Sequence, residues 1–343
     1  MNQRRQFLHT AAAAGALGMG LPMPARAAND WDAVIKRAKE KGEVTIYSSG
    51  VARQEEPRMA AFSKETGVRV NYARPGGGEI VIRKFGQEVQ GGAPLADICT
   101  LTDYALGLHA QKQGWTEAVS LPNEAELSPR FAKRDPGLIP NGGFGLVIVV
   151  NEKMLKVTDA PQSYADLADP KFKGQILFGA PENAGSTTVM IKGMVEQYGW
   201  DYVKKLRANE VAEMRLQAEA MQAVARGEKP ICVVAQAWGY LYQKQGAPTR
   251  MIFPSDGVVI AQTCLFVAKN APHPDGALML ANHLISAKYQ ESVLATGVYG
   301  SNRNAPLAEG IPPLDSIKIY EPNLPELVET RGEIIDTWRR IMS

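Results

Sequence analysis

The chain has 343 residues, of which 38 are lysine or arginine and 36 are aspartate or glutamate. Its apolar content of 45% is ordinary for a globular protein, and its length exceeds what one compact core of usual size holds, so two domains are expected. Removal of the first 27 residues would take away three arginines and no acid, leaving 35 basic residues (38 less three) against 36 acidic ones. That balance gives no electrostatic reason to bind nucleic acid or an anionic membrane.

Residues 1–27 have the composition of an export signal. They contain the pair Arg4-Arg5, a short apolar run interrupted by glycine and proline, and a small-residue end at Ala25-Arg26-Ala27. This order is typical of a twin-arginine signal, with cleavage expected near Ala27–Ala28. The apolar run falls short of the roughly 20 residues that a membrane-spanning helix needs. The sequence therefore predicts a periplasmic protein without membrane insertion; the alternative is an uncleaved amphipathic tail.

Helix and strand signals then alternate along the chain. Period-two runs rich in β-branched residues predict strands, and apolar residues every three to four positions predict helices. The expected elements are a helix over 31–42, a strand over 44–48, a helix over 53–65, a strand over 68–72, a helix from 76–78 to 89, a strand over 96–100 and a helix over 104–113. This alternation predicts a mostly parallel sheet with helices on both faces.

A second set of elements lies between two long apolar strands, 144–150 and 257–269, after an aperiodic stretch over 115–142. The set comprises a helix from Ser163, a strand over 175–178, helices over 186–198 and 200–207, a strand over 210–215, a helix over 220–226, a strand over 230–235 and a helix over 239–245. Helices after Pro274 are expected to return to the first lobe. Two long strands that bracket a middle unit predict a discontinuous domain joined by two crossing segments, which is a hinge topology.

The sequence contains no recognisable catalytic or metal-binding motif. Cys99, Cys232 and Cys264 each sit in an apolar run, and their odd number and wide spacing favour buried, reduced thiols over disulfides or a metal site. The nucleophile elbow, the zinc-protease helix, the C-x-x-C pair and the calcium loop are all missing from the sequence. We therefore predict no catalytic residue, no metal ligand and no cofactor, and expect a protein that is not an enzyme.

Small and polar residues follow the predicted strands, at the sheet edge where α/β proteins bind ligands. Gly185-Ser186-Thr187 opens a helix, so its free N–H groups and two hydroxyls would suit an anion, and Ser48-Ser49 would supply the opposing half. Trp238 could stack on a ring or a cation. The predicted ligand-binding residues are Ser48, Ser49, Gly77, Gly78, Thr102, Asp103, Gly185, Ser186, Thr187 and Trp238. The competing interpretation is that the serines and Thr187 only cap helices and that Trp238 only packs.

Several segments, in the same order, resemble the periplasmic solute-binding proteins of ABC importers, in the subgroup of ferric-iron, thiamine, phosphonate and sugar-phosphate binders. The matching pieces are the leader, Val44-Thr-Ile-Tyr-Ser-Ser49, Ala93-Pro-Leu-Ala-Asp-Ile98, Phe144–Val150 with Asn151-Glu-Lys-Met, the run ending Asp-Pro-Lys-Phe-Lys-Gly174, Gly185-Ser-Thr, and Val267-Ala-Lys-Asn-Ala-Pro-His-Pro. The resemblance implies an α/β type II binding protein of two lobes, residues 28–144 with 262–343 and residues 145–261. Each lobe would be a mostly parallel sheet flanked by helices, joined by a two-strand hinge.

The resemblance also implies the partners: a small solute, bound by hinge closure, and an inner-membrane permease, with the binding protein a monomer. Iron binders of the family carry a tyrosine pair where this chain has Ala237 and Trp238, with Tyr240 and Tyr242 further along the helix. Hydroxyl-rich helix ends suit an organic anion better, such as a phosphonate, a sugar phosphate or a carboxylate. Arg74 is a candidate cation for the cleft or a surface residue. Ferric-iron transport, a sensor role, and an extracytoplasmic hydrolase or lyase remain alternatives.

Overall fold

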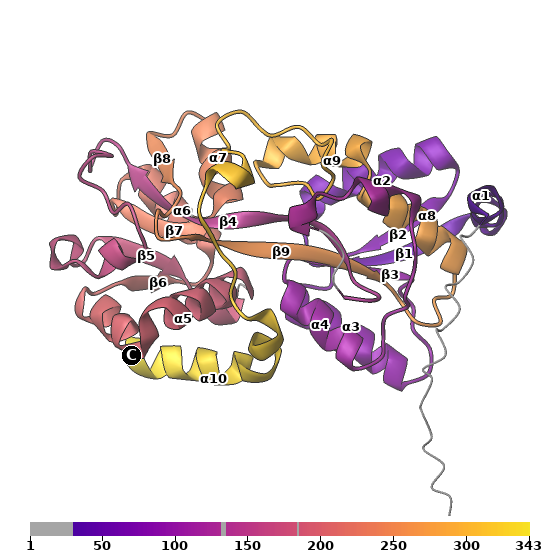
Figure 1. Cartoon of the computed structure of the whole chain (residues 1–343), viewed down its shortest axis with the longest axis horizontal. Helices are drawn as coiled ribbons and strands as arrows, with labels where there is room; N and C mark the ends of the chain where they lie inside the picture. The colour runs from indigo at the N-terminus through magenta and orange to yellow at the C-terminus, as the bar shows by residue number, and fades with distance from the viewer. Residues whose placement is uncertain (1–29, 132–134, 184) are drawn as a thin grey trace, which may run out of the picture.

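A computed structural model describes residues 30–131, 135–183 and 185–343. The predicted export signal lies outside the described residues. Within these ranges the strands form one sheet in the order β2-β1-β3-β9-β4-β7-β5-β6, with β10 beside β9 and β8 beside β4. The sheet divides into two groups of strands, one in each half of the molecule, which β4 and β9 connect (Figure 1).

The first half follows the alternating pattern of the sequence. Its parallel strands are β1 (Glu43–Ser48), flanked by β2 (Arg69–Ala73) and β3 (Ile98–Leu101). Its N-terminal helices are α1 (Trp31–Lys41), α2 (Ala52–Thr66), α3 (Gly78–Gln90) and α4 (Tyr104–Lys112). Residues of α1 and α2 pack in one buried cluster and residues of α3 and α4 in another, so helices cover both faces of the sheet. The predicted elements of this half are confirmed, with small shifts at their ends.

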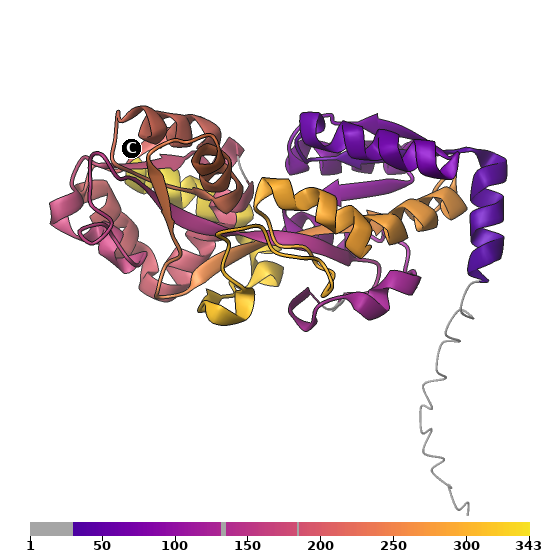
Figure 2. The ribbon, with the colours of Figure 1, turned by 90° about the horizontal axis from the view of Figure 1, so that it is seen from above.

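Two long antiparallel strands, β4 (Ile139–Asn151) and β9 (Val258–Val267), run from one half to the other (Figures 1 and 2). They pair with each other from Ile139 opposite Leu265 to Gly145 opposite Ile260, with a register shift between Pro140 and Gly142. On its other edge, β9 pairs with β3 of the first half from Cys264 to Val267, and beyond Gly145 β4 pairs with β7 and β8 of the second half. This confirms the prediction of two crossing strands, although β4 begins inside the stretch that the sequence left irregular.

The second half repeats the arrangement. Strand β5 (Ile176–Gly179) lies between β6 (Ala212–Met214) and β7 (Ile231–Ala235), all parallel, and β8 (Thr249–Ile252) pairs with β4. Its helices are α5 (Gly185–Ala208), α6 (Gln217–Arg226) and α7 (Gln236–Lys244). Gly199, with φ 71°, kinks α5 between the two helices that the sequence predicts.

Two expectations for this half do not hold. The helix expected from Ser163 is only a 3₁₀ turn over Ala165–Ala168. Ser163 and Asp166 exchange the capping hydrogen bonds at 3.0 and 3.1 Å, but Pro170 follows and disfavours helical backbone at the residue before it. The second difference is strand β8, which the sequence does not predict because four residues are too few to show an alternating pattern.

The C-terminal segment divides between the halves. Helix α8 (Pro274–Leu284), followed by α9 (Ala287–Val293), packs on α1 and β1, whereas β10 (Ile319–Tyr320) joins β9 and α10 (Leu324–Met342) lies along α5 (Figure 1). Trp338 of α10 is fully buried; its ring stacks on Phe178 at 5.9 Å, and its Nε1 donates to Glu213 at 2.8 Å. The expected return of every helix after Pro274 to the first lobe therefore fails for α10, since its apolar face fills the core of the second half.

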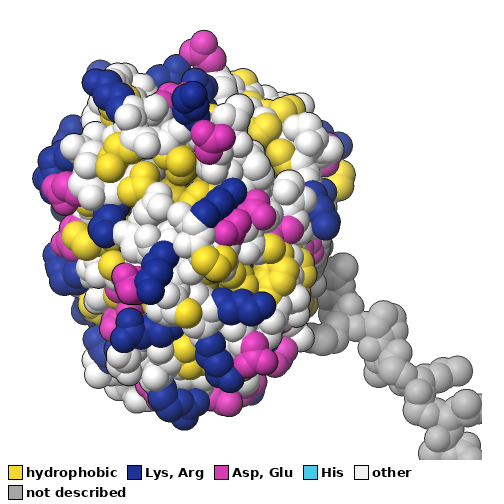
Figure 3. Space-filling model, turned by 90° about the vertical axis from the view of Figure 1, so that its left-hand side faces the viewer, with side chains coloured by type: hydrophobic (Ala, Val, Ile, Leu, Met, Phe, Trp, Pro, Cys, Tyr) yellow, Lys and Arg dark blue, Asp and Glu magenta, His cyan; other side chains and the backbone are white. Residues whose placement is uncertain are grey.

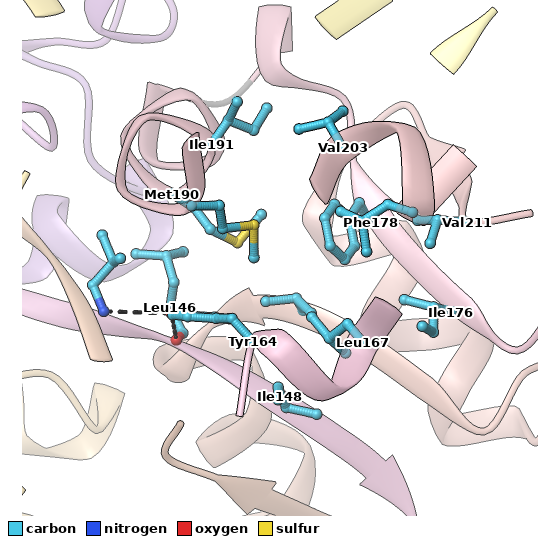
Figure 4. Packing of buried hydrophobic residues seen from close by; sticks show 14 of the residues in the cluster. Leu146, Ile148, Tyr164, Leu167, Ile176, Phe178, Met190, Ile191, Val203 and Val211 are labelled. Carbon is cyan, nitrogen blue, oxygen red and sulfur yellow. Dashed lines mark hydrogen bonds between the residues drawn. The ribbon is translucent and has the colours of Figure 1, made fainter. Parts of the chain in front are cut away.

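The core of the second half also anchors both crossing strands. Leu146 of β4, Phe178 of β5 and Met190 of α5 belong to one buried hydrophobic cluster (Figure 4). The hydroxyl of the fully buried Tyr164 donates to the Leu146 carbonyl at 2.6 Å and accepts from the Val259 N–H at 3.4 Å. One buried side chain thus ties a connecting segment to β4 and β9 together.

The three cysteines are free and buried, as the sequence predicts. Burial raises the pKa of each thiol above its ordinary value, which keeps Cys99, Cys232 and Cys264 protonated and unreactive.

Candidate functional site

A cavity of about 1050 Å³, the cleft, lies between the two halves. Its walls come from the loops that follow β1, β2 and β3 on one side and β5 and β7 on the other, and β4 contributes residues 141–144. These loops leave the carboxyl ends of the parallel strands, the edge at which open α/β sheets bind ligands. Eight of the ten predicted ligand-binding residues line the cleft: Ser49, Gly77, Gly78, Thr102, Asp103, Gly185, Ser186 and Trp238.

Ser49 and Thr102 form a hydroxyl pair on the wall of the first half. Ser49 Oγ accepts from the Thr102 N–H at 2.9 Å and lies 3.3 Å from Thr102 Oγ1. The Ser49 N–H in turn donates to the Thr100 carbonyl at 3.1 Å, so the loops after β1 and β3 are fixed to each other. Both hydroxyls therefore have a defined position at the cleft wall before any ligand arrives.

Three helices begin at the cleft with no side-chain cap. The N-cap residues are Val51 for α2, Gly77 for α3 and Ala235 for α7, and none of them accepts a hydrogen bond through its side chain from the first turn. All three residues lie beside or within the cleft lining. Helix starts carry unpaired N–H groups and a partial positive charge, so these ends favour an anion in the cleft.

On the opposite wall, Gln217 holds together the segments that carry Ser186 and Trp238. Its amide nitrogen donates to Ser186 Oγ at 3.2 Å and to Thr187 Oγ1 at 2.9 Å, and its carbonyl oxygen accepts from the Ala235 N–H at 2.9 Å. The start of α5, the start of α6 and the end of β7 thereby form one unit. The half-buried Trp238 lies in the first turn of α7 and lines the cleft.

Ser48 and Thr187, the two remaining predicted residues, do not line the cleft. Ser48 is fully buried, donates to Glu55 at 2.5 Å and accepts from the Gly50 N–H at 3.0 Å. Thr187 is also fully buried and bonded to Gln217. Both side chains organise loops next to the cleft and do not line it. Neither caps a helix, because the N-cap of α2 is Val51 and Thr187 lies within α5.

Asp103 connects the two halves at the floor of the cleft. As the N-cap of α4 it accepts from the Ala105 N–H at 3.0 Å, and its other oxygen accepts from Arg331 of α10 at 2.5 Å. It also lies against Gly185, where an added Cβ would come within 2.6 Å of Asp103 Oδ2. Because the carboxylate is 98% buried and engaged on three sides, it is a structural anion and is not free to recognise a ligand.

Sequence reasoning missed Arg58, Asn141, Gln217 and Tyr289, all of which line the cleft. Each lies alone within a helix or an irregular strand, so no motif in the neighbouring sequence predicts that it lines a binding site. Thr100 Oγ1 and Asn141 Oδ1 have no hydrogen-bond partner among the described residues, although both atoms are buried at this wall. Two oxygen atoms beside the cleft, one at the end of β3 and one at the bulge of β4, can therefore still accept hydrogen bonds.

The tyrosines considered for iron lie elsewhere. Tyr240 is buried in an apolar cluster with Tyr299, and Tyr242 packs against the cluster beneath α7; neither lines the cleft. Tyr289 and Tyr299 do line it, and burial raises the pKa of both hydroxyls above the ordinary value, so they are neutral donors. Among the described residues, no group of three or more His, Cys, Asp or Glu side chains could hold a metal ion.

Comparison with known proteins finds one family model and relatives that are named for different ligands. The model of the family described as bacterial extracellular solute-binding protein matches residues 93–321. A relative in Salmonella typhimurium with the provisional name 2-aminoethylphosphonate-binding periplasmic protein is 23% identical, over 87% of this chain and 92% of its own. Iron uptake protein A1 of Synechocystis is 23% identical, over 80% and 78% respectively. The structure of periplasmic binding protein AfuA from Actinobacillus pleuropneumoniae, with fructose 6-phosphate bound, has a TM-score of 0.78 at 24% identity and covers 88% of this chain and 99% of that one.

The contact between Asp103 and Arg331 yields a prediction on stability. Asp103→Ala and Arg331→Ala are each expected to lower the free energy of unfolding by about 3–5 kcal/mol, because each leaves the other charge largely buried and without this partner. The double variant is expected to lose clearly less than the sum, since both changes remove one shared interaction. Urea unfolding followed by circular dichroism measures these values.

The matched control is Lys112→Ala, which breaks an ion pair between α4 and α10 whose side chains are 61% and 58% exposed. That change is expected to stay within about 0.5 kcal/mol. Strictly additive losses in the Asp103 and Arg331 variants would contradict a coupled pair.

Proposed function

The chain belongs to the bacterial extracellular solute-binding proteins, and we propose that it captures a small organic anion, most simply a phosphonate or a phosphate ester, in the cleft. The family consists of binding proteins, not enzymes, that serve ABC importers. Identity of 23–24% to relatives named for different ligands leaves the solute itself to be argued from the cleft.

The convergence of uncapped helix starts carries this proposal. Helices α2 and α3 begin on one wall and α7 on the other, so a ligand in the cleft meets N–H donors from both halves. Ser49 and Ser186 add hydroxyls on opposite walls. Charge-assisted hydrogen bonds contribute about 1.5–3 kcal/mol each, so four or five of them support a micromolar complex, which needs about 8 kcal/mol net.

Apolar side chains in the same cavity favour an organic body on the anion. Trp238 and Phe144 line one part of the cleft, and the exposed side chains of Val51 and Ile80 line its first-half rim. A ring or a short carbon chain would bury against these surfaces while the acidic group meets the donors. The relative with the phosphonate name and the AfuA complex with fructose 6-phosphate both fit this class.

Iron transport is the second candidate, because one relative is named for iron uptake. Ferric iron requires anionic oxygen or nitrogen ligands, and the tyrosines of α7 point away from the cleft into apolar clusters. The cleft lining does contain carboxylates, but Glu55 accepts from two hydroxyls, and Glu79, Asp103 and Glu182 pair with arginines. Among the described residues, no three of the His, Cys, Asp and Glu side chains gather into a possible metal site. The anion is therefore the better-supported cargo.

We propose that binding closes the cleft about β4 and β9 and that an inner-membrane permease recognises the closed form. A ligand that touches both walls stabilises the conformation in which both are within reach. The predicted twin-arginine leader and the periplasmic names of relatives support export to the periplasm. No described helix has both the length and the apolar character to cross a membrane.

The end of the second half carries charges of both signs. Lys and Arg side chains are interspersed there with Asp and Glu (Figure 3). A mixed surface of this kind gives nucleic acid no continuous basic stripe on that face. Transport and sensing use the same closed form, so a receptor partner remains the alternative to the permease.

A ligand panel tests the proposed class. Thermal unfolding of the mature chain is measured with fructose 6-phosphate, 2-aminoethylphosphonate, succinate, thiamine and Fe(III). A phosphonate or phosphate ester is expected to stabilise the fold by about 2.7 kcal/mol at 100 times its Kd, because only the folded state binds it. Stabilisation by Fe(III) alone would favour the iron candidate, and turnover of any panel member would favour an enzyme.

A double variant tests the two-walled cleft. Ser49→Ala combined with Ser186→Ala is expected to weaken anion binding by more than about tenfold, or 1.4 kcal/mol, since it removes one hydroxyl from each wall. Isothermal titration calorimetry gives the affinity. Ser255→Ala is the matched control, because Ser255 also follows a strand but lies outside the cleft lining. Equal affinity in the double variant and the control would contradict contact with both walls.

A further inference from the structure

We propose that Arg58 and Arg74, on the wall of the first half, bind the acidic group of the ligand. The inference rests on the proposed function and assigns the anion to a particular part of the cleft. The sequence had favoured Gly185-Ser186-Thr187 for this role, and Arg58 had no sequence signal at all.

The Asp103 carboxylate lies beside the start of α5. It lies against Gly185, so close that an added Cβ would be 2.6 Å from its Oδ2 and 3.3 Å from its Cβ. Arg331 holds the same carboxylate at 2.5 Å. A second negative group at Gly185 would be crowded by this carboxylate, which Arg331 already neutralises, so we expect the acidic group of a ligand elsewhere in the cleft.

The arginines of the cleft differ in their partners. Arg331 pairs with Asp103 and with Glu79 at 3.5 Å, and Arg339 pairs with Glu182 at 3.0 Å. Arg58 donates to the Ser292 carbonyl at 3.0 Å, and Arg74 donates to the Gly50 carbonyl at 2.5 Å. Within the described part of the chain, neither Arg58 nor Arg74 has a carboxylate within ion-pair distance. The two arginines of α10 are therefore paired with carboxylates of the protein, whereas Arg58 and Arg74 can pair with the acidic group of a ligand.

One carboxylate, Glu55, stands near this pair and leaves it with a net positive charge. Glu55 Oε2 accepts from the hydroxyls of Ser48 at 2.5 Å and Tyr72 at 2.9 Å, which fixes the carboxylate over Gly50. Arg58, Arg74 and Glu55 together carry a formal charge of +1. Glu79 and Asp103, the other first-half carboxylates of the cleft lining, pair with Arg331. An anionic ligand neutralises this excess, whereas a cation such as Fe(III) would add to it.

The loop over residues 49–51, which contacts Arg74 and leads into the helix of Arg58, supports the placing of the acidic group at these arginines. Residues 49–51 line the cleft, with the Ser49 hydroxyl at one end and the uncapped start of α2 at Val51. Arg74 is bonded to the middle of this loop, and Arg58 lies on the second turn of α2 beside Tyr289. Planar guanidinium groups bind phosphate and phosphonate through paired N–H bonds, so a doubly charged head group fits this wall better than a monocarboxylate.

The test compares arginine variants that differ only in their place relative to the cleft. Calorimetry measures the binding of fructose 6-phosphate, 2-aminoethylphosphonate and inorganic phosphate to Arg58→Gln, Arg74→Gln and Arg53→Gln. Arg58→Gln and Arg74→Gln are expected to raise the Kd of each probe that binds the wild type by at least about tenfold, because each removes a charge-assisted contact. Arg53→Gln, exposed on α2 and outside the cleft lining, is expected to stay within about twofold.

The remaining outcomes separate the inference from the proposed function. Wild-type affinity in both Arg58→Gln and Arg74→Gln, with binding still weakened in the Ser49 and Ser186 double variant, would overturn the arginine pair and leave the anion-binding function intact. Failure of every probe to bind the wild type would overturn both. The exposed side chain of Arg74 makes Arg74→Gln informative even if Arg58→Gln unfolds, and Arg58→Lys is expected to recover part of the affinity by restoring the charge.

Discussion

Backbone hydrogen bonds between β4 and β9 set the relation of the two halves to each other. The pairing runs from Ile139 opposite Leu265 to Gly145 opposite Ile260, and each strand then continues into the sheet of one half. Since the parallel strands on either side end at this crossing, their carboxyl ends face each other across the cleft. This pairing positions the loops, helix starts and arginines of the site. A shift of one residue in the register of β4 against β9 would turn every side chain of the shifted strand to the other face of the sheet.

A second connection, made by side chains, distinguishes this chain from a simple two-strand hinge. Helix α10 is anchored in the second half by Trp338, and its Arg331 reaches Asp103 of the first half, beside Gly185. This contact places a paired carboxylate beside the start of α5, whereas Arg58 and Arg74 have no carboxylate within ion-pair distance among the described residues. Under the proposed function, this difference directs an acidic ligand toward the two arginines.

The sequence predicted the architecture well because local and global preferences agree in it. Alternating helix and strand patterns, with glycines at helix ends, identified the elements of both halves, and the two long apolar strands identified the crossing. The sequence-based prediction failed for α10, because this helix packs on the second half through the contact of Trp338 with Phe178, which is distant in sequence. It also failed for the helix expected from Ser163, which is only a short 3₁₀ turn before Pro170. Within the site, residues at strand ends such as Ser49 and Ser186 were predictable from topology. Arg58, Gln217 and the true position of Ser48 were not, because each depends on contacts between loops that no local pattern encodes.

Small-angle X-ray scattering of the mature chain, with and without the organic anion that stabilises it most, tests the central claim of closure around the β4–β9 crossing most directly. A reduced radius of gyration is expected at saturating ligand, because a ligand held by both walls draws the halves together. An unchanged scattering curve despite full occupancy would contradict closure, and would mean that the ligand binds one wall of a rigid molecule.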